Sequence, residues 1–319
     1  MMKNIFASLA LFAYFYVRPT LAATYGLTDS WTGSAFFSEF TWENIPDPTN
    51  GRVNYLDQAT SRSLGLATVD GEDLILRSDH TTVLTPGGPG RNSFRIRSNK
   101  VFTTHVAVFN IKHMPQGCGT WPAVWEVTKN TWPDGGEIDI LEGVNDQGPN
   151  VVSLHTSPGC TMPANRVELG EDATFDCNIF ANSNSGCGTR VTDPRGYGPE
   201  FNANGGGWYA IERTPAFIKV WFWSNSDLVP NDVRNSGITV NTDGWGTPWA
   251  FFPNTQCNLE EHFDEHFIVV NLTFCGDFAG AVYPFSGCPS TCNDFVENNP
   301  NAFNEAFFTL GGIRVFGTQ

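Results

Sequence analysis

The chain has 319 residues, of which 16% are charged and 13% are aromatic. Its formal net charge of -15 argues against a nucleic acid or an anionic membrane as partner, because phosphate groups are bound through Lys and Arg. An apolar fraction of 40% is too high for a disordered chain, and 32 Gly with 20 Pro indicate many turns and few long helices. These numbers favour a globular, acidic protein with an uncharged partner.

The N-terminal segment has the three parts of a secretory signal peptide. Lys3 precedes an apolar run over residues 5–17, and Ala22 suits the small-residue cleavage site. The run is too short to span a membrane, which takes about 20 apolar residues. A buried N-terminal helix is the alternative interpretation. We expect a signal peptide over residues 1–22 and one secreted, extracellular and monomeric domain over residues 23–319.

Eight Cys in an oxidising compartment indicate up to four disulfides, whose connectivity cannot be deduced from the sequence. Cys177 and Cys187 flank a polar loop and are the favoured local pair. Zinc binding is the competing interpretation, yet no CxxC pair occurs, and the segment from His262 to His266 lacks the Glu of a zincin helix. We therefore expect neither a metal nor a cofactor. The glycosylation sequon at Asn271 lies in an apolar, strand-like run, which argues against its use.

Short apolar runs separated by turn signals recur along the chain and predict β-strands. One short helix is expected over residues 300–307, with Pro at its first position, and the polar stretch 175–199 is expected to be a loop. Many short strands without intervening helices indicate an all-β sandwich or barrel, and about 300 residues suffice for one large core. The predicted strands cover residues 73–77, 93–98, 101–109, 150–156, 208–213, 217–223, 266–274 and 312–316.

One strand-like segment, residues 132–143, carries three acids within an apolar run. Glu137 and Asp139 are two residues apart and share a face of the strand, whereas Glu142 falls on the opposite, core-facing side. A charged Glu facing the core is costly unless it is paired. A β-bulge between Asp139 and Glu142 resolves this conflict, because one extra residue returns all three acids to one face.

Three carboxylates on one face suit glycoside hydrolysis. Mutual repulsion raises the pKa of at least one, so that one acid stays protonated while another is ionised. Glycosidases need that division between a general acid and a nucleophile, and the distance between the two carboxyls decides between retention and inversion. A solvated strand face and a calcium site are the alternatives, although the Asp/Asn-rich loop spacing of calcium sites is absent.

The segment Gly136-Glu-Ile-Asp-Ile-Leu-Glu142 resembles the ExDxxE signature of glycoside hydrolase family 16, particularly that of secreted fungal laminarinases, which are endo-1,3(4)-β-glucanases. The family's ExDxE branch lacks the extra residue and needs no bulge. The resemblance extends over nearly the whole mature chain, but departs at Phe278, where related laminarinases usually have Trp. Further matching blocks begin at Gly51, Gly90, His113, Asn204, Gly244 and Asn271.

This resemblance implies a concanavalin-like β-jelly-roll sandwich of two antiparallel sheets with a concave glycan-binding cleft. It also implies a retaining double displacement, in which Glu137 resembles the nucleophile, Glu142 the acid/base and Asp139 the acid that tunes the nucleophile. Flat Trp rings can cover the C–H face of a pyranose, although most Trp residues in a protein only pack. By resemblance, the substrate-binding residues are Trp125, Trp132, Trp121, His155, Arg95 and Asn54.

The sequence therefore predicts a secreted endo-β-1,3(4)-glucanase acting on a β-1,3-glucan, with mixed-linked and 1,6-branched forms included. A transglycosylase on the same scaffold and a non-catalytic glycan-binding lectin are the alternatives. Three acids on one strand argue against the lectin, because binding alone does not need them. For Arg95 and His155 the alternative interpretations are a surface charge and a hydrogen-bonded core histidine.

Overall fold

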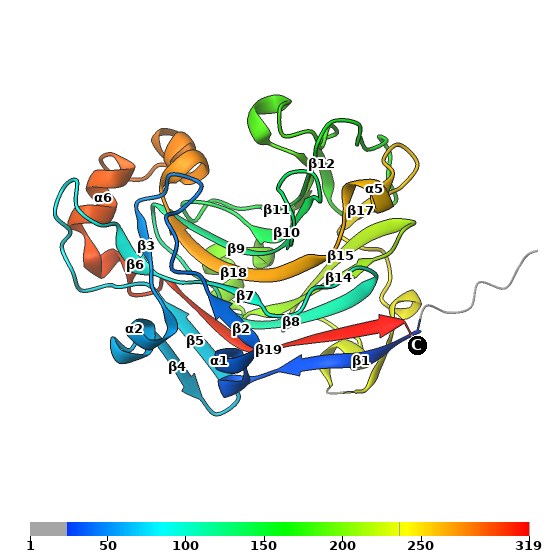
Figure 1. Ribbon diagram of the computed structural model, residues 1–319, viewed down its shortest axis with the longest axis horizontal. Helices are drawn as coiled ribbons and strands as arrows, with labels where there is room; N and C mark the ends of the chain where they lie inside the picture. Colours follow the sequence, from blue (N-terminus) through cyan, green and yellow to red (C-terminus); the bar gives the residue numbers. More distant parts are fainter. Residues whose placement is uncertain (1–23, 236, 319) are drawn as a thin grey trace, which may run out of the picture.

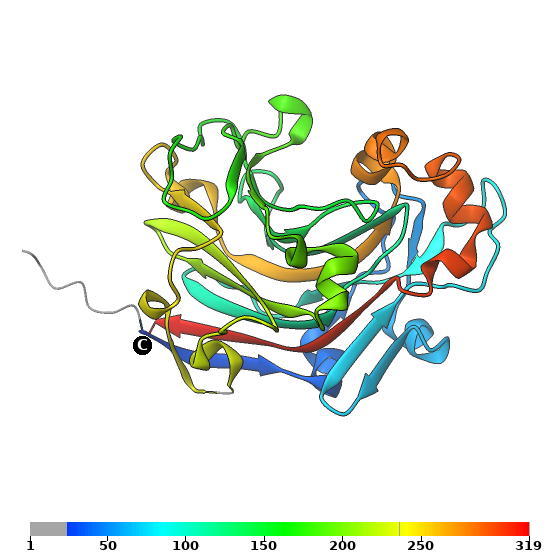
Figure 2. The same ribbon diagram turned by 180° about the vertical axis from the view of Figure 1, so that it is seen from behind.

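The computed structural model describes residues 24–235 and 237–318. The predicted signal peptide and its cleavage site after Ala22 lie outside the described residues. Two large antiparallel sheets stack face to face, as the layered strands in Figures 1 and 2 show. This arrangement confirms the predicted all-β sandwich of two antiparallel sheets. Within the described ranges there is no helix long and apolar enough to cross a membrane.

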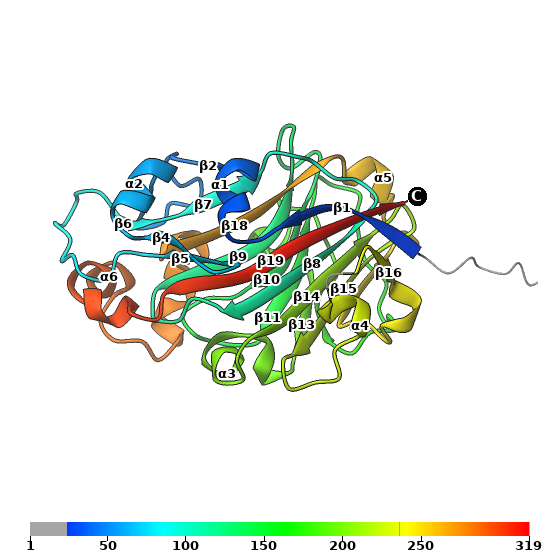
Figure 3. The ribbon, with the colours of Figure 1, turned by 90° about the horizontal axis from the view of Figure 1, so that it is seen from below.

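The first sheet contains nine strands within the described part of the chain. Its main order is β16-β1-β19-β8-β14-β15-β17, and β5 pairs with the first part of β19 and with β4. Figure 3 shows β1, β19, β8, β14 and β15 side by side. The strands are β1 Thr24–Trp31, β4 Ala67–Asp70, β5 Asp73–Arg77, β8 His105–His113, β14 Gly207–Arg213, β15 Phe217–Ser224, β16 Thr239–Asn241, β17 Ala250–Pro253 and β19 Phe307–Thr318.

The second sheet has eight described strands in the order β12-β13-β11-β10-β9-β18-β7-β2, with β10 near its centre. The segments around β12 and α6 rise on opposite sides of β9, β10 and β18 (Figures 1 and 2). A separate parallel pair joins β3 Val53–Tyr55 to β6 Arg91–Ser93. The strands of the second sheet are β2 Phe40–Trp42, β7 Arg95–Ser98, β9 Thr120–Thr128, β10 Glu137–Glu142, β11 Asn150–His155, β12 Glu171–Thr174, β13 Cys187–Val191 and β18 His266–Phe274.

Two local predictions need correction. The expected loop over residues 175–199 contains β13, which pairs with β11 and β12 and so extends the second sheet. The helix expected over residues 300–307 is only a short turn, Pro300–Phe303, because β19 begins at Phe307. The α-helices are α1 Phe36–Glu39, α2 Gln58–Ser63, α3 Gly198–Ala203, α4 Asn231–Arg234, α5 Leu259–His262 and α6 Cys292–Asn298. The other helical turns are η1 Gly33–Ala35, η2 Asn182–Asn184, η3 Pro194–Gly196, η4 Thr242–Gly244, η5 Gly276–Gly280, η6 Tyr283–Phe285 and η7 Pro300–Phe303.

All eight cysteines lie in the described part of the chain, and they form four disulfides. The local pair favoured by the sequence, Cys177–Cys187, is confirmed. Four disulfides are typical of proteins that pass through an oxidising, secretory compartment. The other three bonds are Cys118–Cys288, Cys160–Cys257 and Cys275–Cys292.

The main core lies between the two sheets, and a second apolar cluster covers the outer face of the first sheet. On β15, Val220 and Phe222 join the main core, whereas Trp221 points the other way into the second cluster. Trp221 packs edge to face against Trp245, with ring centroids 5.2 Å apart. Some of the aromatic residues therefore serve packing on a face remote from the three acids.

A buried group of charged and polar side chains joins the two sheets. Glu126 on β9 is fully buried, and its Oε1 lies 2.8 Å from Nε2 of His105 on β8. Its Oε2 lies 3.9 Å from Arg213 on β14 and equally far from His266 on β18. Burial and the Arg213 charge lower the pKa of His266 to about 3, so this imidazole is neutral at ordinary pH.

We expect this group to make the fold sensitive to acid. An unfolded His266 binds a proton below its ordinary pKa of 6.5, whereas the folded protein resists that proton until about pH 3. Protons therefore favour unfolding in this window. Urea unfolding at pH 7 and pH 4.5 measures the effect. His266→Gln, which retains a donor for the Gly135 carbonyl, should lose less stability between these pH values than the wild type. An equal loss in both proteins would contradict this prediction.

Candidate active site

The strand β10 contains the bulge that the sequence predicts. Its pairing with β9 shifts register between Asp139 and Leu141, so that Ile140 is an extra residue. Both Ile140 and Leu141 are buried in the main core. The predicted β-bulge between Asp139 and Glu142 is therefore confirmed.

The bulge leaves the three acids on the face of the second sheet that points away from the main core. Residues paired directly across an antiparallel ladder share a face. The partners of Glu137, Asp139 and Glu142 on β9 belong to a small apolar cluster separate from the main core, namely Val127, Trp125 and Ala123. We call this side of the sheet the acid-bearing face.

A buried histidine supplies positive charge to the acid-bearing face. His155 on β11 pairs directly with Glu137, and its Nε2 lies 3.3 Å from Oδ2 of Asp139. Its Nδ1 lies 3.1 Å from Oδ1 of Asn184. Burial lowers the pKa of His155, but contact with Asp139 and the charges of the two glutamates outweigh burial and raise it to about 10. The side chain is therefore an imidazolium at neutral pH.

The two glutamates bind protons more tightly than an ordinary Glu. Burial and the charge of Asp139 raise the pKa of Glu137 to about 7 and that of Glu142 to about 8. The positive charge of His155 opposes both shifts. Each glutamate also has an indole partner: a hydrogen bond from Trp132 lowers the pKa of Glu137, and Nε1–H of Trp121 donates to Oε1 of Glu142 at 2.8 Å. Burial and the neighbouring carboxylate thus favour the protonated form of both glutamates.

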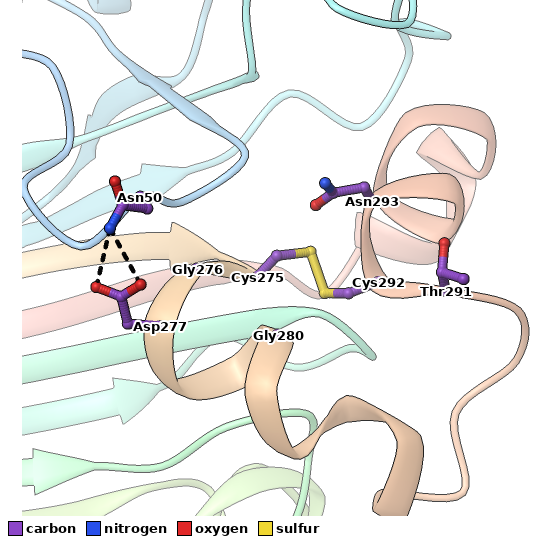
Figure 4. Close-up of a pocket in the computed structure, with 8 residues that line it drawn as sticks. All are labelled: Asn50, Cys275, Gly276, Asp277, Gly280, Thr291, Cys292 and Asn293. Atoms are coloured by element: carbon purple, nitrogen blue, oxygen red, sulfur yellow. Dashed lines mark hydrogen bonds between the residues drawn. A yellow bond between two sulfur atoms is a disulfide. The ribbon is translucent and has the colours of Figure 1, made fainter. Parts of the chain in front are cut away.

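The indole of Trp121 contacts both Glu142 and the segment that follows β18. Its ring meets that of Phe278 edge to face, with centroids 5.6 Å apart. Asp277 and Gly280, on either side of Phe278, line a pocket of about 370 Å³ (Figure 4). Asn50 closes one side by donating from Nδ2 to both carboxylate oxygens of Asp277, each at 3.1 Å. None of the three acids, and neither Trp121 nor Phe278, is among the residues that line this pocket.

A cation and an indole lie together beside the acids. Trp125 is buried opposite Asp139, and the guanidinium of Arg95 lies 4.8 Å from the centre of the Trp125 ring. Nε of Arg95 donates to Glu43 at 2.7 Å. Arg95 is therefore a fixed, paired cation on this face and not a free surface charge.

The sequon residue Asn271 belongs to the same face. Its Oδ1 accepts a hydrogen bond from Nε1 of Trp125 at 2.8 Å, and its Nδ2 donates to Thr273 at 3.2 Å and to Tyr55 at 3.3 Å. Because the buried carboxamide is used at both ends, the structure leaves no room for a glycan at Asn271.

The structure does not bring all six predicted sugar-binding residues equally close to the acids. His155, Trp132 and Trp121 interact with the carboxylates, and Trp125 with Arg95 lies beside them. Trp132 is 41% exposed and offers the most open of these rings. Asn54 instead donates from Nδ2 to Oδ1 of Asn92 at 2.7 Å. Its described hydrogen bonds do not reach the acids.

Three ligand-type atoms of Glu137, Asp139 and His155 lie within 4.8 Å of one another. The raised pKa of His155 makes it a proton carrier and a poor metal ligand at neutral pH. Its imidazolium already offsets the charge of Asp139. The two histidines with zincin-like spacing do not lie on one helix, because His262 ends α5 and His266 begins β18.

Sequence reasoning missed several residues that support the acids. Asn184 contacts His155, Glu43 holds Arg95, and Asn150 binds backbone groups on both sides of the bulge. Asn184 and Glu43 come from other segments of the chain, Asn150 lies on the next strand, and no local motif marks any of the three. The predicted bulge could have signalled one such residue, because an extra residue in a strand leaves backbone groups in need of partners.

Residues 40–316 match the family model described as XgeA-like, catalytic GH16 domain. The chain belongs to glycoside hydrolase family 16. This membership confirms the resemblance drawn from the ExDxxE segment and its flanking blocks. The chain spans 41% to 70% of the length of the curated relatives it matches.

Three family 16 relatives illustrate the similarity. The endo-1,3(4)-β-glucanase of Arthroderma benhamiae is 38% identical over 304 residues, which cover 92% of this chain and 65% of that protein. The structure of laminarinase 16A from Phanerochaete chrysosporium is 56% identical, with a TM-score of 0.91 over 92% of this chain and 100% of that chain, and it holds 6-O-glucosyl-laminaritriose in both donor and acceptor sites. An elongating family 16 β-1,3-glucosyltransferase is 36% identical, with a TM-score of 0.85 over 92% of this chain and 99% of that chain.

The imidazolium of His155 should control both glutamate pKa values. In His155→Gln we expect the pKa of Glu137 and of Glu142 to rise by about 1 unit, because a positive charge beside the carboxylates is removed. Carbon-13 NMR titration of labelled glutamate carboxyls measures this shift without any substrate. His113→Gln is the control, since His113 bonds to the Phe307 carbonyl on the other sheet. Unchanged glutamate titrations in the His155 variant would contradict this prediction.

Proposed function

We propose that this family 16 chain is a secreted endo-β-1,3(4)-glucanase that hydrolyses internal β-1,3 bonds of laminarin-like and mixed-linked glucans. The observation that carries the proposal is the bulge that sets Glu137, Asp139 and Glu142 on one face of β10. The names and bound oligosaccharides of the relatives support the substrate class. The proposal assigns residues 1–22 to a signal peptide and residues 23–319 to one catalytic domain, monomeric and without a metal or cofactor.

In the proposed reaction, Glu137 is the nucleophile and Glu142 is the acid/base. The carboxylic acid of Glu142 gives its proton to the glycosidic oxygen while the Glu137 carboxylate attacks the anomeric carbon. The glycosidic C–O bond breaks, and a glycosyl ester with Glu137 forms. Water then attacks the anomeric carbon, Glu142 takes its proton, and the ester bond breaks to restore the Glu137 carboxylate. Two inversions at the anomeric carbon give overall retention.

The proton affinities of the two glutamates support this assignment. The raised pKa of about 8 keeps Glu142 protonated near neutral pH, as a proton donor requires. The pKa of Glu137, raised to about 7, still allows a carboxylate to form near neutral pH, as a nucleophile requires. Asp139 and His155 form a charge pair between them that adjusts both values. Activity should therefore fall as pH rises and Glu142 loses its proton.

The proposed substrate contacts surround these acids. Trp132 and Trp121 each bond to a glutamate, and we assign their rings, with that of Trp125, to the C–H faces of the sugar. We assign Arg95 and His155 to sugar hydroxyls beside the reacting bond. For Asn54 the assignment rests on the family resemblance, because its described hydrogen bond goes to Asn92.

The experiment that tests this function measures reducing ends released from laminarin and from a mixed-linked glucan. Glu137→Ala should abolish release, because no glycosyl ester can form, and azide should restore turnover of an activated aryl glycoside as the α-glycosyl azide. Glu171→Ala is the matched control, since Glu171 is an exposed residue on β12 of the same sheet. Wild-type protein that releases no reducing ends from either glucan would contradict the function. Normal turnover by the Glu137 variant would remove the nucleophile assignment.

Transglycosylation is the second candidate, because a β-1,3-glucosyltransferase is 36% identical over 92% of this chain. A sugar hydroxyl would then replace water in the second step on the same residues. Products longer than the starting oligosaccharide distinguish the two activities.

A further inference from the structure

The bulge in β10 leaves part of the strand without its regular ladder to β11. The two strands pair in register from Glu137 to Asp139, and the pairing then stops. Continuing that register would set Glu142 opposite Asn150. The interruption falls in the buried middle of the sheet, where backbone N–H and C=O groups without partners destabilise the fold. These groups therefore require another partner.

One side chain satisfies both groups. Oδ1 of Asn150 accepts the backbone N–H of Glu142 at 2.7 Å, and its Nδ2 donates to the carbonyl of Ile140 at 3.1 Å. Asn150 is completely buried. A single planar carboxamide thus spans the bulge and holds the strand on both sides of Leu141.

The carboxamide is itself fixed by the opposite sheet. Its Nδ2 also donates to the hydroxyl of Tyr209 on β14 at 3.1 Å, and that hydroxyl donates to the carbonyl of Gly196 at 2.6 Å. Tyr209 is fully buried. The shape of the bulge is therefore tied across the core to a strand that carries none of the three acids.

We propose that Asn150 is a positioning residue that sets the place of Glu142 as the acid/base. This inference rests on the proposed function. Position 150 requires one short side chain with an acceptor for the Glu142 N–H and a donor for the Ile140 carbonyl. Asp would retain the acceptor but lose the donor, and Ala would lose both.

The effect of Asn150 should be selective between the two glutamates. We call the two hydrogen bonds from the Asn150 carboxamide to β10 the clamp. Glu142 depends on the clamp through its own backbone N–H, whereas Glu137 lies in the regular part of the ladder, opposite His155. A displacement of about 1 Å of a catalytic group can lower a rate by about 100-fold. Loss of the clamp should therefore impair proton transfer and leave nucleophilic attack in place.

The experiment compares two substrates in wild type and in Asn150→Ala. The first is laminarin, whose leaving group needs a proton, and the second is a 2,4-dinitrophenyl laminaribioside, whose leaving group does not. On laminarin we expect kcat to fall about 100-fold with KM unchanged. On the aryl glycoside, formation of the glycosyl ester should be nearly unchanged, and azide should restore turnover. The product should be the β-glycosyl azide, because Glu137 still forms the ester that azide then displaces.

Three further variants make the test specific. Asn150→Asp retains the shape and the acceptor. Tyr209→Phe removes the hydroxyl that accepts from Asn150 and donates to the Gly196 carbonyl, and leaves both hydrogen bonds of Asn150 to β10 in place. Both variants should show the same pattern with a smaller loss. Asn202→Ala is the matched control, because Asn202 also holds backbone groups at both ends, accepting from the Met114 N–H at 2.8 Å and donating to the Met114 carbonyl at 2.9 Å. It should lower stability without changing the ratio of the two activities.

Several outcomes would overturn the proposal. Equal losses on both substrates in the Asn150 variants would indicate general damage to the fold, and the α-glycosyl azide would mean that Glu137 is displaced as well. Unchanged activity on laminarin, or the same selective loss in Asn202→Ala, would also contradict it. A wild type that cleaves neither substrate would contradict the proposed function and, with it, this role. If the wild type is active and the Asn150 variants lose activity equally on both substrates, the role of Asn150 is contradicted and the proposed function is not.

Discussion

A single extra residue in β10 determines how the acid-bearing face is built. The strand must fill the core with Ile138, Ile140 and Leu141 and still present three acids to the opposite face. Strict alternation of side chains cannot do both, because the acids are spaced by two and then by three residues. The bulge resolves this conflict at the level of the backbone. The imidazole of His155 and the indole of Trp125 come from residues that pair directly with Glu137 and Asp139 on that irregular strand.

Bringing three acids together has an electrostatic cost, and the surrounding residues reduce it. Burial and mutual repulsion raise the pKa values of Glu137 and Glu142, while the His155 imidazolium and two indole N–H groups oppose that rise. The three carboxyl groups are therefore neither all ionised nor all protonated at neutral pH. The site holds a proton near Glu142 at neutral pH. A site without His155 would retain more protons and lose the nucleophilic carboxylate.

The sequence predicted the features that depend on neighbouring residues. Alternation and turn signals predicted the all-β class and most of the strands, the family resemblance implied the two-sheet sandwich, and the conflict between polar and apolar positions predicted the bulge. Features that depend on distant segments were not predictable. The Cys118–Cys288 bond spans 170 positions, β13 is a strand because β11 lies beside it, and the link between Asn150 and Tyr209 crosses the core between two sheets. Asn54 was assigned by resemblance alone, and its described partner is Asn92.

The extra residue and Asn150 depend on each other. In an ExDxE segment the acids are spaced by two throughout, so a regular strand presents them on one face and its ladder leaves no backbone groups free. A buried Asn beside such a strand would lack the two backbone partners that Asn150 has here, and its unmatched carboxamide oxygen would destabilise the core. A bulge without Asn150 would leave the Ile140 carbonyl and the Glu142 N–H unsatisfied. Neither feature is favourable alone in this chain, so the ExDxxE segment of β10 depends on a residue outside the motif, on the neighbouring strand, to complete it.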